Sequence, residues 1–301
     1  MQHLTSLSKS QQDGVIDLIK AATQQDGTPP ISEHIVLHLR HGGDKSDSHL
    51  LIEEANKVIG YAHIDATDLV AGPSVELVVH PEHRKSGLGK ELLVKAKDIC
   101  GDQIRLWAHG DSSAAQKLAE ENGFERIRTV IQMRKELADV HTHQHNFEIR
   151  TFLPGIDNEE WLALNNQAFK DHPEQGNWSE KDLQTRLSES WFDPSGFFVA
   201  IENSKMIGFT WTKIHGGHSH KHDEESEQHD HDPIGEIYIT AVSKPGIGLG
   251  KVLTETALAY LKRSDLTSAM LYVDSNNQKA LNLYKSLGFV ESAQDVMYRV
   301  S

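Results

Sequence analysis

The sequence predicts an α/β protein made of two tandem copies of one mixed-sheet domain, and two observations support this fold class. The chain has 301 residues, whereas a single domain usually has about 100 to 200. Its two halves also repeat one order of expected elements, which is two helices, three strands, a helix, a strand, a helix and a strand. We therefore expect two similar domains, each able to bury its own core.

A strand, a glycine-rich turn and an amphipathic helix form the clearest repeated unit. The first copy reads VELVVHPEHRKSGLGKELLVKA, with a helix expected from about Gly87 to Ile99. The second reads EIYITAVSKPGIGLGKVLTETALAYL, with a helix from about Gly248 to Lys262. A short strand, near 104–108 and near 269–273, and then a helix ending in Gly-Phe follow each unit. The shared succession indicates a duplicated fold.

A polar segment, HTHQHN, marks the expected boundary between the copies. We expect an N-terminal domain over residues 1–139, a linker over 140–147 and a C-terminal domain over 148–301. A histidine- and acid-rich stretch over 215–233 interrupts the second copy between two strands. Its composition favours a solvated loop over a metal-binding tract, because such sequences supply ligands without fixed geometry.

Composition limits the class of function. The chain is 38% hydrophobic and 25% charged, as in ordinary globular proteins. It has no apolar run near the ~20 residues that span a bilayer and no signal-peptide pattern, so we expect a cytoplasmic protein without a membrane partner. We also expect it to be a monomer. The net charge of −14 opposes binding to nucleic acid and suits an amine-bearing small molecule. The single cysteine, Cys100, excludes an internal disulfide, and we expect an inert thiol there.

The glycine turns predict anion binding. A strand that leads through such a turn into a helix presents backbone N–H groups and the positive end of the helix dipole. The first turn has the form R-x-x-G-x-G over residues 84–89, which differs from both the dinucleotide fingerprint and the P-loop. The second, KPGIGLG, has Pro245 at the position of Arg84, and proline donates no N–H.

At these turns the sequence resembles the GNAT acetyltransferase superfamily. The resemblance implies that each turn holds the diphosphate of acetyl-CoA and that the preceding strand pairs with its pantetheine arm. The implied contacts in the first half are Leu77, Val78, Val79, Arg84, Lys85, Ser86, Gly87, Leu88 and Gly89. Those in the second half are Thr240, Ala241, Val242, Gly246, Ile247, Gly248, Leu249, Gly250, Lys251, Asn277, Gln278, Lys279, Ala280, Leu281 and Asn282.

The same resemblance implies two catalytic residues in the second half. Glu236, at the start of the strand GEIYITAV, is the implied base, and Tyr284, on the last helix, is the implied neighbour of the thioester sulfur. Period-two alternation predicts that Glu236 points to the same side as Tyr238 and Thr240. The simpler roles are a surface carboxylate at a strand end and a core aromatic.

The first half lacks both groups when the halves are aligned. Alignment of the Gly-Phe endings places Ala119 at the position of Tyr284, and alignment of the strand ends places Pro73 at that of Glu236. Glu76 lies three residues from the end of its strand rather than six, so alternation predicts that it faces the other side. We therefore expect the first domain to be a non-catalytic, cofactor-binding scaffold.

Several strings extend the resemblance to the mycothiol synthase family over nearly the whole chain. They are ELVVHP, LWAHGD and IQMRKEL in the first half and HPEQGNW, WFDP, WTKIH, GEIY and LYVDSNN in the second. The resemblance implies acetyl-CoA-dependent acetylation of the cysteinyl amine of cysteinyl-glucosaminyl-inositol, without a metal. The implied acceptor contacts are Glu33, Glu174, Lys213, Glu236 and Tyr272. Carboxylates suit a polyhydroxylated ligand that carries an ammonium group.

Two other functions stay open at this stage. One is acetylation of a different amine, such as an aminoglycoside or a protein N-terminus, since the cofactor residues would be the same. The other is a non-catalytic acyl-CoA sensor or a histidine-rich metal buffer. Glu33 also suits a helix N-terminal charge after Ser32, and Lys213 a solvated strand-end lysine.

Overall fold

A computed structural model describes residues 1–41, 47–66, 72–101, 103–170, 176–215 and 233–300. By their contacts, the residues form two compact units, one made of Met1–Ile131 with Ala293–Ser301 and the other of Gln132–Ser292. Each unit is an α/β structure with a mixed sheet, as the sequence predicts. None of the described helices combines the length and the apolar character needed to cross a bilayer.

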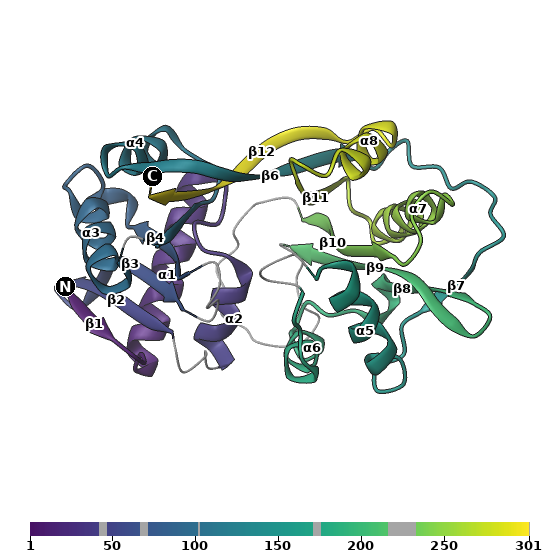
Figure 1. The fold of residues 1–301 in the computed structure, drawn as a ribbon, viewed down its shortest axis with the longest axis horizontal. Coiled ribbons are helices and arrows are strands. Elements are labelled where there is room, and N and C mark those ends of the chain that lie inside the picture. Colours follow the sequence, from purple (N-terminus) through teal and green to yellow (C-terminus); the bar gives the residue numbers. More distant parts are fainter. Residues whose placement is uncertain (42–46, 67–71, 102, 171–175, 216–232, 301) are drawn as a thin grey trace. The chain divides into compact units, whose positions relative to one another are not determined.

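The first unit has one sheet with strand order β1-β2-β3-β4-β5-β12 (Figure 1). Strands β4 and β5 are parallel, and the other neighbouring pairs are antiparallel. Its elements are β1 (Gln2–Leu4), α1 (Lys9–Asp26), α2 (Glu33–His41), β2 (Ser48–Glu54), β3 (Lys57–Asp65), β4 (Ser74–Val79), the 3-10 helix η1 (Pro81–His83), α3 (Leu88–Cys100), β5 (Arg105–Ala108), α4 (Ser113–Glu121) and the start of β6 (Phe124–Glu136).

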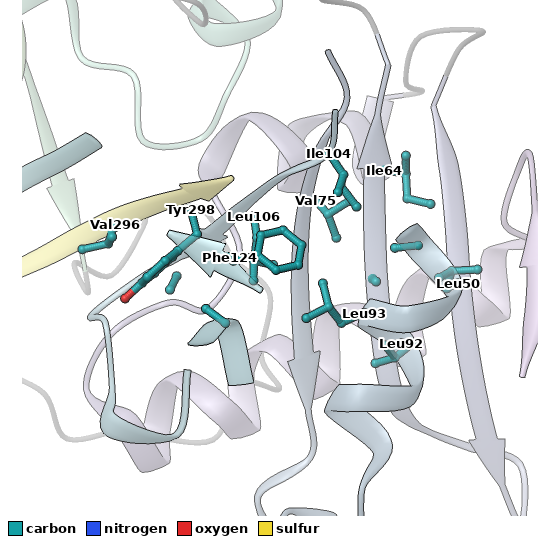
Figure 2. Packing of buried hydrophobic residues seen from close by; sticks show 14 of the residues in the cluster. Leu50, Ile64, Val75, Leu92, Leu93, Ile104, Leu106, Phe124, Val296 and Tyr298 are labelled. Carbon is teal, nitrogen blue, oxygen red and sulfur yellow. The ribbon is translucent and has the colours of Figure 1, made fainter. Parts of the chain in front are cut away.

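Helices cover both faces of this first sheet. On one face, α3 contributes Leu92, Leu93 and Ala96 to a core that includes Val75 and Leu106 of the sheet, as Figure 2 shows in part. On the other face, α1 and α2 pack against Leu51, Tyr61 and Val78. Alternation along the strands produces this two-sided core, because successive side chains point to opposite faces.

The second unit repeats the plan with strand order β6-β11-β10-β9-β8-β7. Helices α5 and α6 pack on one face through a core rich in tryptophan and phenylalanine, and α7 packs on the other. Its elements are β7 (Glu148–Thr151), α5 (Asn158–Ala168), α6 (Glu180–Leu187), the 3-10 helix η2 (Pro194–Gly196), β8 (Phe197–Glu202), β9 (Lys205–His215), β10 (Ile234–Val242), α7 (Leu249–Arg263), β11 (Ser268–Asp274), α8 (Gln278–Ser286) and β12 (Val290–Val300).

The last strand of the chain completes the sheet of the first unit. Residues Val296–Arg299 of β12 pair antiparallel with β5, and Val296 and Tyr298 lie in the core that Figure 2 shows. The division between the units therefore falls inside β6 and β12, and residues 140–147, the linker expected from the sequence, belong to the second unit. There the backbone N–H of His143 donates to Glu255 at 3.1 Å.

The expected elements around the glycine turns are confirmed. The predicted helices from Gly87 and Gly248 are α3 and α7, each shifted by one residue, and the predicted short strands are β5 and β11. Cys100 ends α3 half-buried, and burial raises the pKa of its thiol, which disfavours the reactive thiolate.

Candidate active site

The two glycine turns end in the same backbone conformation. Gly87 precedes α3 with φ 92° and ψ −6°, and Gly248 precedes α7 with φ 84° and ψ −6°. Positive φ favours glycine, because a β-carbon there clashes with the backbone. The second turn reaches this conformation with Pro245 three residues earlier, so the proline leaves the start of the helix unchanged.

Neither of these helix starts is capped by a side chain of the described residues. By contrast, α1, α4, α6 and α8 have side-chain caps, which are Ser8, Ser112, Ser179 and Asn277. The first-turn N–H groups of α3 and α7 therefore lack the partner that a capping side chain provides. A β-carbon built at Gly87, Gly246 or Gly248 would meet no atom within 4 Å. Open amides at the positive end of a helix fit the diphosphate of coenzyme A.

Basic residues in both turns already pair with carboxylates. Arg84 donates two hydrogen bonds of 2.7 Å to Asp26, and Nζ of Lys251 lies 3.8 Å from Glu255. These carboxylates partly cancel the charge that the two side chains offer a phosphate. The backbone amides of the turns are therefore the groups best placed to bind an anion.

The other expected residues of the first turn shape it. Ser86 donates to the carbonyl of His83, and Lys85 has a positive φ of 63°. Leu88 packs against the core beside α3, and a β-carbon at Gly89 would lie 3.6 Å from Leu118. These residues set the path of the backbone into α3.

Each unit's parallel strand pair separates before the glycine turn. The pairing of β4 with β5 ends at Glu76, and the pairing of β10 with β11 ends at Ile237. The segments Leu77–Val79 and Thr240–Val242 continue beyond those points, paired only on their other side. Such strand edges can form main-chain hydrogen bonds with an extended ligand. The pantetheine positions expected from the sequence therefore lie at open edges.

A β-bulge at Tyr238 corrects the alternation expected along β10. Ile237 pairs with Thr212 and Ile239 with Trp211, so Tyr238 is an extra residue. Tyr238 contacts Trp211 and stays on the face of Glu236. Thr240 does not, because its hydroxyl lies 2.7 Å from that of Thr210 on the α7 side of the sheet. The prediction that Thr240 shares the side of Glu236 was wrong, since the extra residue reverses the alternation.

Glu236 is a buried carboxylate beside a lysine and a histidine. It is 7% exposed, lies across β9 from Lys213, and has an oxygen 2.6 Å from Nε2 of His215. Burial alone would raise the pKa of Glu236, but the hydrogen bond and charge of His215, together with the charge of Lys213, lower it below its usual value. The carboxylate therefore stays ionised and can accept a proton or dock an ammonium group.

Lys213 lies in an aromatic setting on the same face. Its Nζ lies 4.5 Å from the ring centroid of Trp191 and 5.6 Å from that of Tyr238. Burial lowers the pKa of Lys213 to about 8, although Glu236 acts against this. The ammonium group can therefore lose its charge at mildly basic pH.

Tyr272 joins this face from the neighbouring strand. Met270 of β11 pairs with Glu236, and Tyr272 follows two residues later on the same side. Tyr272 is 37% exposed and accepts a hydrogen bond of 2.8 Å from Nε2 of Gln132. The structure thus gathers Lys213, Glu236 and Tyr272 on the sheet face opposite α7.

Tyr284 lies on α8, which contacts the start of α7. A β-carbon at Gly250 would lie 3.6 Å from its neighbour Leu283. The ring of Tyr284 packs edge-on against Phe289 at 5.8 Å, and burial raises its pKa to about 12. In the described part of the chain, no group forms a hydrogen bond with the Tyr284 hydroxyl, so this donor is available to a ligand.

The other expected residues of α8 have mostly structural roles in this structure. Asn277 caps the helix by accepting a hydrogen bond from the N–H of Ala280 at 3.1 Å. Gln278 donates to the carbonyl of Ser275, and Leu281 is buried. Lys279 and Asn282 are exposed, as is Ile247 in the preceding turn.

Two expected acceptor contacts lie outside the described residues of the second unit. Glu174 lies outside the described residues. Glu33 is the first residue of α2 in the first unit, directly after Ser32, where it suits the positive end of the helix dipole.

The strand registers also correct the alignment of the two halves. Val79 pairs with Gly60 and Val242 with Gly208, and the bulge adds one residue to β10. The position that matches Glu236 is therefore Ser74 rather than Pro73. Ser74 pairs with Asp65 and Arg105 as Glu236 pairs with Lys213 and Met270. The first unit still lacks a carboxylate at this position.

Glu76 faces the equivalent side of its sheet, contrary to the prediction from alternation. The bulge explains this, because the extra residue makes the six steps from Glu236 to Val242 equivalent to the five steps from Ser74 to Val79. Glu76, two residues after Ser74, therefore faces the side that Glu236 faces. Glu76 is 4% exposed, lies 3.1 Å from Nε2 of His109 and accepts a hydrogen bond of 2.5 Å from the N–H of Ser32. Asp295 of β12 holds the other nitrogen of His109 at 3.1 Å. These contacts already occupy the Glu76 carboxylate.

Sequence reasoning missed His215, Trp191 and Gln132. Alternation on β9 signals His215, which lies two residues after Lys213 and so on the same face. Gln132 and Tyr272 are 140 positions apart, and no local pattern connects them.

Comparison with known proteins identifies the fold of both halves of the chain. Residues 159–289 match a family model described as acetyltransferase (GNAT) family, and residues 45–126 match one described as acetyltransferase (GNAT) domain. A solved tandem GNAT protein from the clavulanic acid biosynthesis pathway has a TM-score of 0.71 and 16% identity, covering 98% of this chain and 96% of that one. This likeness shows the shared fold.

Curated relatives are more closely similar over nearly the full length. The mycothiol acetyltransferase of Acidothermus cellulolyticus is 46% identical, covering 94% of this chain and 89% of the relative. That of Thermomonospora curvata is 44% identical, covering 97% and 95%. The chain therefore belongs to the mycothiol acetyltransferase family of GNAT acetyltransferases.

Proposed function

We propose that this acetyltransferase transfers the acetyl group of acetyl-CoA to the cysteinyl amine of cysteinyl-glucosaminyl-inositol, giving mycothiol and coenzyme A. The observation that carries the proposal is the buried Glu236 carboxylate, with Lys213 across the sheet and Tyr272 on the next strand. The names of the relatives support the choice of acceptor. Acetyl-CoA supplies an activated thioester carbon for the amine to attack.

Glu236 docks the acceptor ammonium and takes its proton. An α-amino group with a pKa of about 7.7 to 8.0 is roughly one-tenth neutral at pH 7, so deprotonation alone gains only about tenfold. The remaining contribution of Glu236 is to hold the nitrogen beside the thioester, since His215 and Lys213 lower the pKa of Glu236 and keep the carboxylate ionised. The nitrogen–carbon bond forms, the carbon–sulfur bond breaks, and the amine proton passes to Glu236.

Tyr284 stabilises the departing thiolate by donating a hydrogen bond. Transfer of the Tyr284 proton, with a pKa of about 12, to a thiolate whose thiol has a pKa of about 8.5 is uphill by about 5 kcal/mol. A donated hydrogen bond carries no such penalty and strengthens as negative charge develops on sulfur. The thiolate then takes its proton from solvent.

Lys213 and Tyr272 bind the hydroxyl groups of the acceptor, together with Glu174. The ammonium and the phenol are donors, whereas the carboxylate accepts hydrogen bonds from sugar and inositol hydroxyls. The aromatic rings beside Lys213 suit the apolar faces of a sugar ring.

The two halves have different roles in this proposal. The C-terminal domain, residues 148–301, is catalytic, and the N-terminal domain, residues 1–139, is a cofactor-binding scaffold without chemistry of its own. Ser74 and Ala119 at the positions of Glu236 and Tyr284 support this division. We further propose that the enzyme acts as a cytoplasmic monomer on small molecules, and its net charge of −14 supports the lack of a nucleic-acid partner.

Competition among acceptors tests the proposal. Release of coenzyme A is measured with cysteinyl-glucosaminyl-inositol, glucosaminyl-inositol, free cysteine, an aminoglycoside and a peptide N-terminus. We expect kcat/KM for the cysteinyl glycoside to exceed each of the others by about 100-fold or more, a difference of about 3 kcal/mol. Mass spectrometry should place the acetyl group on nitrogen. Equal kcat/KM values across the panel would contradict the proposal that the cysteinyl glycoside is the acceptor.

A further inference from the structure

In the first unit, two histidines and an aspartate lie close together on the face of the sheet that α2 covers. His38 lies on α2, Asp47 directly precedes β2, and His63 lies on β3. Nδ1 of His38 is 3.0 Å and Nε2 of His63 is 3.9 Å from the same oxygen of Asp47. The side chains of His63 and Asp47 are 1% and 2% exposed, and that of His38 is 16% exposed. The acetyltransferase chemistry uses none of these residues.

Hydrogen bonds fix the orientation of His63. The Tyr61 hydroxyl lies 2.8 Å from Nδ1 of His49 and 3.3 Å from Nδ1 of His63. Because Tyr61 has one proton, it donates to one ring and accepts from the other. Both arrangements leave Nε2 of His63 directed at the Asp47 carboxylate. Nε2 of His63 is therefore a buried nitrogen with a fixed orientation.

That nitrogen has no hydrogen-bond acceptor or donor among the described residues, although it is fully buried. A distance of 3.9 Å to Asp47 exceeds hydrogen-bond length. If Nε2 carries a lone pair, it faces a negative charge, and if it carries a proton, the proton lacks an acceptor. A buried polar atom without a hydrogen-bond partner costs free energy of folding, and a cation bound between His63 and Asp47 removes that cost.

The spacing fits a single metal ion. The three ligand atoms lie within 4.8 Å of one another. Ligands at about 2.0 to 2.2 Å around a tetrahedral zinc ion are roughly 3.3 to 3.6 Å apart, which lies between the two measured separations. A neutral imidazole nitrogen is the form of histidine that binds zinc. Tyr61 supplies the outer hydrogen bond that orients a ligating histidine.

We propose that His38, Asp47 and His63 bind one divalent ion of the zinc class, with the fourth position open to water. Two imidazole nitrogens and one carboxylate oxygen form a donor set that zinc accepts readily. The ion joins α2, the start of β2 and β3, three segments that are separate in the sequence. Its main effect is therefore on stability, and the acetyl transfer itself does not require it.

The test measures tightly bound metal on the full chain, purified without a histidine tag. The protein is loaded with Zn²⁺, dialysed against a weak chelator and analysed for metal by mass spectrometry. Wild type should retain one ion that both His63→Asn and His38→Asn lack. The control is His83→Asn, which alters the exposed group of His80, Glu82 and His83 and should retain the ion. His38 is partly exposed, so its variant serves if His63→Asn fails to fold.

Thermal unfolding provides a second measurement that is independent of activity. Added Zn²⁺ should raise the unfolding midpoint of wild type and His83→Asn, and should leave that of His38→Asn unchanged. Equal metal retention by wild type, His38→Asn and His63→Asn would overturn the proposal. So would loss of the retained ion when the five histidines of the tract 216–232 are replaced by asparagine while His38 and His63 remain.

Discussion

The His215 ring and the Glu236 carboxylate form a hydrogen bond of 2.6 Å between neighbouring strands of the second unit. His215 ends β9 and its side chain is 35% exposed, whereas that of Glu236 is only 10% exposed. The pair therefore connects a buried carboxylate with a partly exposed imidazole. His215 is therefore a neighbouring group that can pass on a proton taken up by Glu236.

Glu236→Gln removes the carboxylate and keeps its size. We expect kcat/KM for the amine to fall by about 10- to 100-fold, because proton acceptance and ammonium docking are both lost. Steady-state kinetics with the cysteinyl glycoside measures the effect. Glu202→Gln, an exposed glutamate on β8, is the surface control, and Glu76→Gln should lower stability while leaving kcat near the wild-type value. Unchanged turnover in Glu236→Gln would exclude the catalytic role.

Replacement of His215 should change the pH profile more than the fold. The hydrogen bond and charge of His215 lower the pKa of Glu236, so His215→Phe should raise that pKa. The acidic limb of kcat/KM against pH then moves to higher pH, because Glu236 loses its charge earlier as the pH falls. His215→Gln retains a hydrogen-bond donor and should restore part of the shift. Superimposable profiles for wild type and His215→Phe would refute this coupling.

Stability near Lys213 should depend on pH in a defined direction. Burial lowers the pKa of Lys213 to about 8, whereas an unfolded lysine has a pKa of about 10.4. Between these values the unfolded chain binds more protons, so the free energy of unfolding rises with pH. Relative to Lys213→Met, wild type should gain about 2 kcal/mol between roughly pH 7.5 and 9.5. Urea denaturation of both proteins at the two pH values checks this, and parallel behaviour would contradict it.

Tyr284→Phe removes one hydroxyl that has no hydrogen-bond partner among the described residues. We expect kcat to fall by about 10- to 100-fold with little change in stability, because the hydroxyl acts on the developing thiolate. Tyr260→Phe is the matched control, since burial also raises the pKa of Tyr260 to about 12 but its hydroxyl donates to Asp193 at 2.5 Å. That variant should lose stability and keep kcat. If kcat fell in Tyr260→Phe rather than in Tyr284→Phe, the Tyr284 hydroxyl would not be the catalytic donor.

Gly248→Ala places a methyl group in the turn that precedes α7. We expect KM for acetyl-CoA to rise about tenfold, because the methyl occupies the open space beside the first-turn amides. Gly155→Ala is the control, since its φ of 80° imposes a similar strain of about 1 to 2 kcal/mol away from the turns. Gly87→Ala should weaken coenzyme binding only at the first unit. Calorimetry with acetyl-CoA separates these cases, and equal affinities for Gly248→Ala and wild type would exclude diphosphate binding at this turn.

Local sequence patterns predicted much of the site. The strand, glycine turn and helix around Gly248 follow from neighbouring residues, because turn conformation and helix amphipathicity are local properties. The family resemblance, rather than a local pattern, points to Lys213, Glu236 and Tyr272, which the structure places on one sheet face. The side of Thr240 was predicted wrongly, since a bulge arises from competition between two strands and leaves no clear trace in either sequence.

The sequence by itself determined the α/β class, the duplication, the two glycine turns and the difference between the halves at Tyr284 and Ala119. These features depend on residue type and short-range spacing. Only the tertiary structure decided the bulge at Tyr238, the match of Glu236 with Ser74, the hydrogen bond from His215 and the strand β12 that closes the first sheet. The reason is physical, because strand register and buried ion pairs depend on residues that are far apart in the chain and meet only when the sheet forms.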